Sequence, residues 1–199
     1  MAGDVRFRDL DGNNIINNGD GTVKNPGDMR VIGNSLPRYT YSIRGDLNWN
    51  GFDFAVFFQG VGKRDWYPAG ESGLFWGQYD RPYGYSLPWQ NADRWSEDNP
   101  NAYWPRLRGS LAVSGRGTLR AANDRYLQKA RYCRLKNISL GYTLPQKWMS
   151  KIHVKSLRLS ATLTDFFTHS HFPEGWDPEV GTTGYPITKS VLFSAQLKF

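Results

Sequence analysis

Apolar and polar side chains alternate with a period of two along residues 38–49. The odd positions are Tyr39, Tyr41, Ile43, Gly45, Leu47 and Trp49, and the even positions are Arg38, Thr40, Ser42, Arg44, Asp46 and Asn48. Successive side chains of a β-strand point to opposite faces, so the pattern predicts a strand with one apolar and one polar face. The dipeptide Asn50-Gly51 follows, and it favours a two-residue hairpin turn because both residues tolerate positive φ. Alternation resumes over 52–60, which predicts the second strand of a hairpin.

Three further strands are expected, over residues 126–143, 156–167 and 187–199, because the same period of two returns in each segment. Residues 131–136 alternate less regularly, which predicts a β-bulge there. A helical period is nearly absent, and we expect only one short helical turn at 146–151. The fold class that the pattern predicts is all-β, with antiparallel strands that run up and down.

The connections between the expected strands differ strongly in length. Two are short, at 50–51 and 144–155, whereas the two at 61–125 and 168–186 are long. Alternate connections of an up-and-down sheet lie at the same end, so one end carries the short turns and the other the long loops. Bacterial outer-membrane barrels have this asymmetry, and their tilted strands need about 9–11 residues to span the membrane. The pattern therefore favours the C-terminal part of a transmembrane β-barrel with long extracellular loops.

The two ends of the sequence fit this interpretation. The last strand carries Phe193, Leu197 and Phe199 in phase with its apolar face, as expected for a closing barrel strand whose terminal aromatic residue lies at the membrane interface. Residues 1–37 precede the first strand, and we expect them to form an extracellular loop with an Asp/Asn-rich turn. The same pattern also suits a soluble antiparallel β-domain with one buried face, so this alternative stays open.

Composition and charge narrow the function classes. The chain has 25 Lys and Arg against 18 Asp and Glu, but the basic residues are scattered rather than gathered in a run. We therefore expect no nucleic-acid partner, and a basic strand face that lines a polar channel explains the charge. No window approaches the roughly 20 consecutive apolar residues of a membrane helix. The first residues show no signal-peptide core, and the single Cys133 allows no internal disulfide.

Six motifs carry a family resemblance. The two longest are Arg94–Leu107 (RWSEDNPNAYWPRL) and Tyr132–Pro145 (YCRLKNISLGYTLP). The shorter ones are Asp9–Gly12 (DLDG), Val31–Asn34 (VIGN), Phe57–Gly60 (FFQG) and Gly175–Val180 (GWDPEV). In this order and combination the motifs resemble the SusC/RagA family of TonB-linked outer-membrane proteins, over nearly the whole chain.

The resemblance implies a fold, a location and partners. Members of the family are large barrels with an N-terminal plug, in the outer membrane of Gram-negative bacteria of the Bacteroidota type. They import oligosaccharides or peptides with energy from the TonB system and pair with a SusD-like surface lipoprotein. The chain resembles only the last part of such a barrel, about five strands without plug or TonB-contacting segment, so we expect a fragment whose apolar face contacts membrane lipid. The alternative is a secreted soluble β-sandwich that binds carbohydrate, with calcium as a candidate ligand.

A twelve-residue stretch from Asp9 to Asp20 resembles a calcium-binding loop. Its candidate ligands, in order, are Asp9, Asp11, Asn13, the backbone carbonyl of Ile15, Asn17 and Asp20. Asn14 replaces the usual Gly at position six, although Asn tolerates the left-handed conformation, and Asp20 replaces the usual bidentate Glu. No helix is expected on either side, so the alternative is an Asn/Gly-rich surface turn.

Other candidate residues favour structural roles. Trp66, Trp76, Trp89, Trp95 and Trp104 lie in the long loop, where they suit either sugar stacking or a small aromatic core of the loop itself. His169 and His171 lack a third metal ligand nearby in the sequence. No nucleophile–base pair is apparent, so we expect no enzyme. In the barrel interpretation Tyr39, Tyr41, Trp49, Trp148 and Phe199 belong to the apolar face and its aromatic girdle, and Arg38, Arg44, Asp46, Arg158 and Lys198 face the lumen.

Overall fold

The computed structural model describes residues 2–68, 73–80, 86–107, 119, 121–181 and 184–199. The chain divides into two compact units. The first, here the loop unit, comprises Met1–Gly33 and Trp66–Leu127, and the second, here the sheet unit, comprises Asn34–Asp65 and Gln128–Phe199. Each unit is built from segments that are distant in the sequence.

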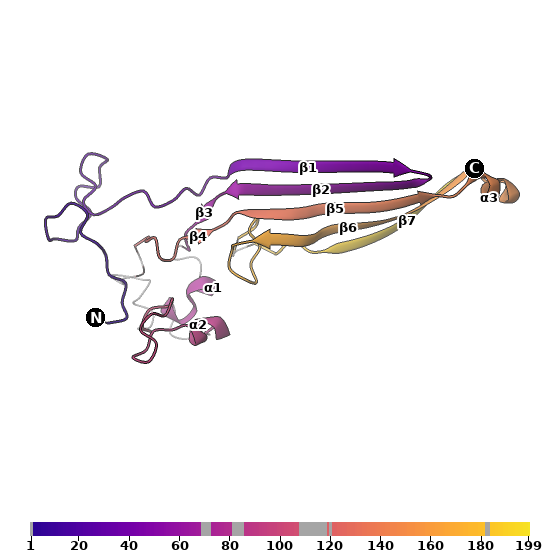
Figure 1. The fold of residues 1–199 in the computed structure, drawn as a ribbon. Coiled ribbons are helices and arrows are strands. Elements are labelled where there is room, and N and C mark those ends of the chain that lie inside the picture. The colour runs from indigo at the N-terminus through magenta and orange to yellow at the C-terminus, as the bar shows by residue number, and fades with distance from the viewer. Residues whose placement is uncertain (1, 69–72, 81–85, 108–118, 120, 182–183) are drawn as a thin grey trace. The chain divides into compact units, whose positions relative to one another are not determined.

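The sheet unit is one five-stranded antiparallel sheet (Figure 1). Its strands are β1 (Arg38–Trp49), β2 (Phe52–Lys63), β5 (Tyr132–Thr143), β6 (Ser156–Ser170) and β7 (Ser190–Lys198). The spatial order β1-β2-β5-β6-β7 follows the sequence, because the intervening β3 (Asp65–Trp66) and β4 (Gln128–Lys129) are short and lie outside this sheet. The predicted all-β, up-and-down arrangement is confirmed, and the sheet is open, with β1 and β7 at its edges.

Several strands begin or end at residues that differ from the prediction. β2 extends to Lys63, which pairs with Arg38, and β6 extends to Ser170, which pairs with Tyr132. β5 begins at residue 132 instead of 126, because Tyr126 is fully buried in the aromatic core of the loop unit and so does not join the sheet. β7 spans residues 190–198 instead of 187–199, since its pairing with β6 begins at Ser190.

The predicted irregularity in the third strand is a β-bulge. Lys136 of β5 is inserted between residues that oppose Phe57 and Phe58 of β2. The register also shifts between β5 and β6, where Asp165 adopts a left-handed backbone with a φ of 56°. A bulge interrupts the regular alternation, so a side chain can point to the face opposite to the one that a regular strand would assign to it. Here it lets Lys136 and Asp165 approach one another, as described below.

Helices are few and short. The loop unit contains α1 (Gly73–Trp76), η1 (Gly77–Tyr79) and α2 (Pro88–Ala92). The connection between β5 and β6 contains α3 (Gln146–Met149) followed by η3 (Ser150–Ile152), where one helical turn was predicted. None of the helices in the described ranges has the length and apolar character needed to cross a membrane.

An aromatic core holds the loop unit together. Trp76, Trp104, Tyr79 and Tyr126 are each no more than 1% exposed, and the rings of Trp76 and Tyr126 pack edge to face with centroids 5.2 Å apart. Two of the buried polar groups donate to backbone carbonyls: the Trp76 indole N–H to that of Pro68 and the Tyr79 hydroxyl to that of Pro105. Of the two interpretations of the loop tryptophans, the structure supports an aromatic core for Trp76 and Trp104.

Candidate functional site

The strand register aligns apolar side chains into rows that cross all five strands. One row is Leu47, Phe54, Leu140, Ala161 and Phe193. The rows on either side of it are Trp49, Phe52, Tyr142, Leu159, Ala195 and Gly45, Val56, Ile138, Leu163, Val191. Many of these side chains are open to the surroundings, such as Leu47 at 63% and Phe193 at 77%. The sheet thus presents one continuous and largely uncovered apolar face, here called the apolar face.

The opposite face is polar. Its matching rows are Asn48, Asp53, Gly141, Ser160, Ser194; Asp46, Ala55, Ser139, Thr162, Leu192; and Arg44, Phe57, Asn137, Thr164, Ser190. Hydroxyl groups bond across the strands, with Thr162 donating to Ser139 at 3.0 Å and the hydroxyls of Ser160 and Ser194 2.7 Å apart. The register puts Arg38, Arg44, Asp46, Arg158 and Lys198 on this polar face and Tyr39, Tyr41 and Trp49 on the apolar face.

Two ion pairs lie on the polar face near the short connections. The Arg158 guanidinium donates from Nε to Oδ1 of Asp53 at 2.9 Å and from Nη2 to Oδ2, a bidentate arrangement that spans β5. It passes over Gly141, where a Cβ would overlap both side chains. Arg44 and Asp46 of β1 form the second pair, at 2.8 Å, with both side chains exposed to solvent. Exposed pairs of this kind contribute little stability, but they place charge on this face of the sheet.

A buried charge network lies at the other end of the sheet, where the long connections begin. Arg134 of β5 is only 2% exposed and contacts Asp177 at 2.8 Å and Glu179 at 3.0 Å. Lys136 contacts Asp165 at 3.0 Å and Glu179 at 3.1 Å. Asp165 of β6 also lies 3.9 Å from Arg134. Each cation is thus shared between a carboxylate of β6 and carboxylates of the connection between β6 and β7. Pairing is what makes burial of such charges tolerable.

This network joins two of the sequence motifs. Arg134 and Lys136 belong to Tyr132–Pro145, whereas Asp177 and Glu179 belong to Gly175–Val180. Burial by itself would raise the pKa of Asp177, but the Glu179 N–H and the Arg134 guanidinium outweigh it and lower that pKa overall. The network therefore fixes part of the long connection 171–189 to the sheet.

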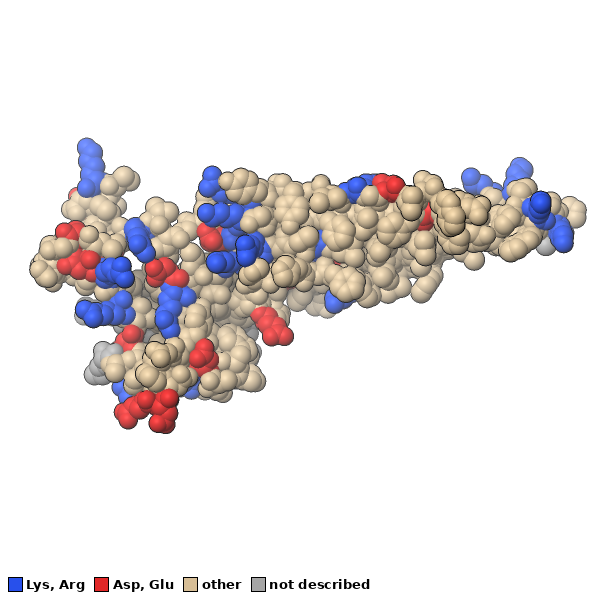
Figure 2. Space-filling view, viewed as in Figure 1, with Lys and Arg blue, Asp and Glu red and all other residues tan. Residues whose placement is uncertain are grey.

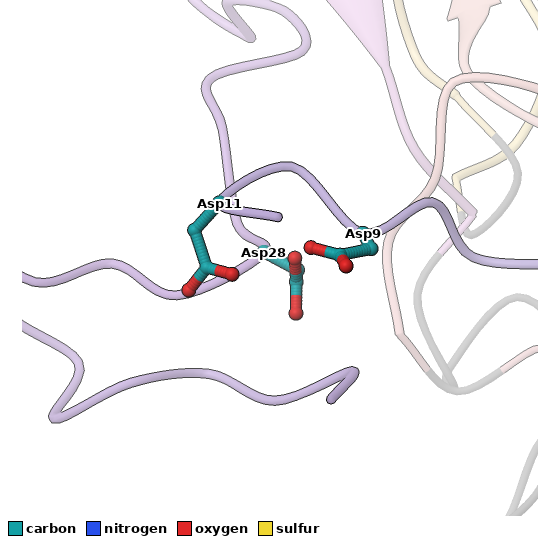
Figure 3. Close-up of side chains that lie close together, drawn as sticks. All are labelled: Asp9, Asp11 and Asp28. Atoms are coloured by element: carbon teal, nitrogen blue, oxygen red, sulfur yellow. The ribbon is translucent and has the colours of Figure 1, made fainter. Parts of the chain in front are cut away.

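The acidic turn near the start of the chain brings three carboxylates together (Figure 3). Carboxylate oxygens of Asp9, Asp11 and Asp28 lie within 4.8 Å of one another. Backbone amides hold them in place: Gly12 donates to Asp9 at 2.6 Å, and Leu10 and Asn17 donate to Asp28 at 2.6 Å and 2.8 Å. The two hydrogen bonds that Asp28 accepts, first that from Leu10 and then that from Asn17, lower the pKa of Asp28.

This arrangement differs from the predicted calcium loop at its last position. Asp28 joins Asp9 and Asp11, whereas the Asp20 carboxylate accepts hydrogen bonds from the backbone and hydroxyl of Thr22. Asp28 lies beyond the predicted loop of residues 9–20. It comes back beside Asp9 and Asp11 because its N–H donates to the carbonyl of Asn17 and closes a longer loop. Asn14 has the left-handed backbone expected of position six, with a φ of 62°.

The other predicted ligand residues serve the turn itself. The Asn13 side chain donates to Asp11 and accepts from Ile15 N–H, and Asn17 accepts from Gly19 N–H while donating to the Ile15 carbonyl. No ion pair to the three clustered carboxylates occurs within the part of the chain that the structure describes. Oxygen donors of this kind are those that Ca²⁺ prefers, so the calcium hypothesis stays a prediction, with Asp28 added to it.

The histidines do not form a metal site with other ligands. His169 and His171 pack edge to face at 5.5 Å, and Arg131 contacts the His171 ring at 2.9 Å. The positive charge of Arg131 lowers the pKa of His171. Among the described residues, no third histidine, cysteine or carboxylate lies close enough to complete a site.

The sequence and the fold of the chain are similar to those of known proteins. TonB-dependent receptors P3 and P26 of Formosa agariphila are 30% and 26% identical to the chain over 87% and 88% of its length. The chain spans only 15% and 16% of the length of these curated relatives. No family model matches. The RagAB peptide transporter structure is 21% identical, with a TM-score of 0.66 over 86% of the chain and 18% of its counterpart, and the RagAB peptide importer in the open-open state gives 0.61 over 85% and 18%.

The fold matches a segment of the RagAB structures, and the sequence is similar to that of TonB-dependent receptors over most of its length. The resemblance to TonB-linked outer-membrane proteins expected from the sequence is therefore supported by sequence similarity and by fold. The relatives are named receptors and the similar structures a peptide importer and transporter, which agrees with the transport function expected from the sequence. The five-stranded sheet of this chain is open, with β1 and β7 at its edges.

Proposed function

We propose that the chain forms the C-terminal wall of the barrel in a TonB-dependent outer-membrane importer. In this role the apolar face contacts lipid and the polar face lines the lumen. The observation that carries the proposal is the unbroken alignment of apolar rows across all five strands. A soluble sheet covers such a face with a second layer, whereas a membrane barrel leaves it to the bilayer.

The two sheet edges support the same proposal. β1 and β7 each have a neighbour on one side only, so each presents a row of backbone N–H and C=O groups without strand partners. Unpaired backbone groups are not tolerated in the hydrocarbon region, where no water satisfies them. Further strands of the receptor would therefore continue the sheet at both edges, as closure of a barrel requires.

The cargo and partners are part of the proposal. We infer that the importer takes up oligosaccharides or peptides, works with a SusD-like lipoprotein and draws energy from the TonB system. The similar solved structures are those of the RagAB peptide importer and transporter, which supports a peptide or a related polymer as cargo. The hydroxyl-rich polar face suits either class, because both carry many hydrogen-bonding groups.

The sandwich alternative lacks a second sheet. A carbohydrate-binding β-sandwich needs strands packed over the apolar face, yet the sheet unit offers none in its described residues, and Leu140 there is 52% exposed. The structure therefore favours the barrel segment.

The proposal is tested by placing one charge on each face of the receptor that carries this segment. Leu140→Arg lies on the apolar face, where an arginine costs up to about 2–4 kcal/mol, most at the bilayer midplane and less toward the interface. Asn137→Arg adds the same charge to the polar face and is the matched control. We expect Leu140→Arg to lower the amount of heat-modifiable receptor in outer membranes and Asn137→Arg to leave it near the unmodified level. Equal assembly of both variants would overturn the proposal.

A further inference from the structure

Lysines gather at the end of the sheet that carries the short connections. Lys147 and Lys151 lie one helical turn apart in the segment formed by α3 and η3, and Lys155 directly precedes β6. Residues four apart share one side of a helix, so the first two ammonium groups lie on the same side. All three side chains are exposed, and they are here called the basic rim.

No acidic side chain accompanies the lysines of the basic rim. Residues 144–157 contain no Asp or Glu. The acidic residues of the neighbouring hairpin are already occupied, since Asp46 pairs with Arg44 and Asp53 with Arg158. Within the described residues, none of the three lysines forms an ion pair. Figure 2 shows Lys and Arg side chains at the tip of the sheet that bears α3, with no acidic group among them.

Exposed aromatic side chains accompany the lysines. Trp148 lies between Lys147 and Lys151 in sequence and is 57% exposed, and Phe199 follows β7 at 79%. Trp49 closes the apolar face at the same end, beside the β1–β2 turn. Aromatic residues of this kind mark the level of the lipid headgroups in membrane proteins.

Lys155 links the basic rim to the apolar face. It has the same strand parity as Leu157 and Leu159, whose pairing partners Leu197 and Ala195 lie on that face. Its backbone N–H donates to the carbonyl of Lys198 at 2.9 Å, which fixes its position at the end of the sheet. A lysine that ends an apolar row can extend its alkyl chain along lipid while its ammonium group reaches the headgroups.

We propose that the basic rim binds the headgroups of anionic phospholipids, such as phosphatidylglycerol, in the leaflet next to the short connections. This inference rests on the proposed function, which puts the apolar face in lipid. Ammonium groups complement the lipid phosphates, and the apolar rows that end at the rim continue into the acyl chains. At the other end of the sheet basic and acidic groups are mixed, because Arg38, Lys63 and Arg131 lie there with the network of Arg134, Lys136, Asp165, Asp177 and Glu179.

The test uses the whole receptor that carries this segment, in nanodiscs with equal parts of phosphatidylcholine and phosphatidylglycerol. After re-extraction into detergent, mass spectrometry gives the ratio of the two lipids that stay bound. The variant Lys147→Gln/Lys151→Gln/Lys155→Gln removes the basic rim. The control Lys24→Gln/Lys63→Gln/Lys129→Gln removes the same charge from exposed lysines outside it.

We expect the unmodified receptor and the control to retain phosphatidylglycerol preferentially. The rim variant should lose this preference by about fivefold or more, since each lysine near an anionic surface contributes roughly a factor of five. Equal retention by the rim variant, or an equal loss in the control, would overturn the inference. A receptor that does not enter nanodiscs at all would instead count against the proposed function, so the two failures are distinguishable.

Discussion

Arg158 of β6 reaches across β5 and holds Asp53 of β2 in a bidentate ion pair. The two residues are separated by 105 positions, and the strand between them is crossed at Gly141. A side chain at that point would occupy the space of the guanidinium or the carboxylate. The pair therefore ties three strands of the polar face together and explains why glycine stands at this place in β5.

Replacing Gly141 tests this relationship. Gly141→Ala should destabilise the assembled receptor by about 1 kcal/mol or less, because a Cβ there displaces the flexible ends of Asp53 and Arg158 from a partly exposed ion pair. Gly45→Ala is the control, since its Cβ would meet only Val56 Cγ1 at 3.3 Å. The midpoint of thermal unfolding, followed by gel mobility, measures the difference. Equal midpoints for the two variants would show that the crossing does not constrain the sheet.

Loss of one partner should lower the free energy of unfolding more in the buried charge network than in the exposed Arg44–Asp46 pair. Arg134→Met leaves Asp177 and Glu179 buried beside Lys136 alone, and removal of one member of a buried ion pair costs about 3–5 kcal/mol. Arg44→Met breaks a fully exposed pair and should have little effect on the free energy of unfolding. Urea unfolding of the refolded receptor gives both values. A small effect of Arg134→Met would mean that the network does not hold the connection 171–189.

The same network gives a pH dependence with a definite sign. The pKa of Asp177 is lowered in the folded state from its ordinary value of 3.8, so the unfolded state binds the proton first as pH falls. The contribution of Asp177 is fully present above pH 3.8 and is lost as pH falls through the lower folded pKa. Asp177→Asn should remove this part of the acid sensitivity, which urea midpoints measured across that range would show. An unchanged acid profile in the variant would contradict the assignment.

Calcium binding at the acidic turn is tested by two aspartates. Asp28→Asn removes one of the three clustered carboxylates and should weaken calcium affinity on the order of tenfold or more. Asp20→Asn should have little effect, because the Asp20 carboxylate bonds Thr22 instead. Calorimetric titration of the receptor with calcium measures both. A larger loss for Asp20→Asn would restore the linear twelve-residue loop, and no binding in any form would exclude the metal.

The tryptophans of the loop unit divide into buried and accessible ones. Trp104 is 1% exposed, so Trp104→Ala should destabilise this unit by about 3–5 kcal/mol. Trp89 is 39% exposed and packs on Trp104 from the outside, so Trp89→Ala should cost much less. Limited proteolysis of the receptor compares them. Equal protection of both variants would mean that the aromatic core does not organise the connection.

Local pattern was sufficient to predict the sheet. The alternation of side chains in β1 and β2, with Asn50-Gly51 between them, predicts the hairpin and both faces, because strand parity alone decides which side chains share a face. The bulge near Lys136 was also apparent as a break in alternation. These features depend on neighbours in the sequence, which one sequence shows directly.

Contacts between distant residues were not predictable in this way. Asp28 joins Asp9 and Asp11 only because the chain returns after a turn, and nothing in the local pattern marks it as a ligand. Likewise Tyr126 has the spacing of a strand residue, yet burial among aromatic rings removes it from β5. The network between Arg134 and Asp177 joins two motifs that the sequence identified separately.

The central claim, that the apolar face contacts lipid, is tested most directly by single cysteines on adjacent residues of β7. Phe193→Cys lies on the apolar face and Ser194→Cys on the polar face, in a receptor whose free Cys133 is replaced by serine. The two sites carry a spin label in reconstituted membranes, and collisions with oxygen and with a water-soluble nickel complex are compared. The account predicts oxygen access without nickel access at residue 193 and greater nickel access at residue 194. Strong nickel access at residue 193 would contradict it, because that face would then lie in water.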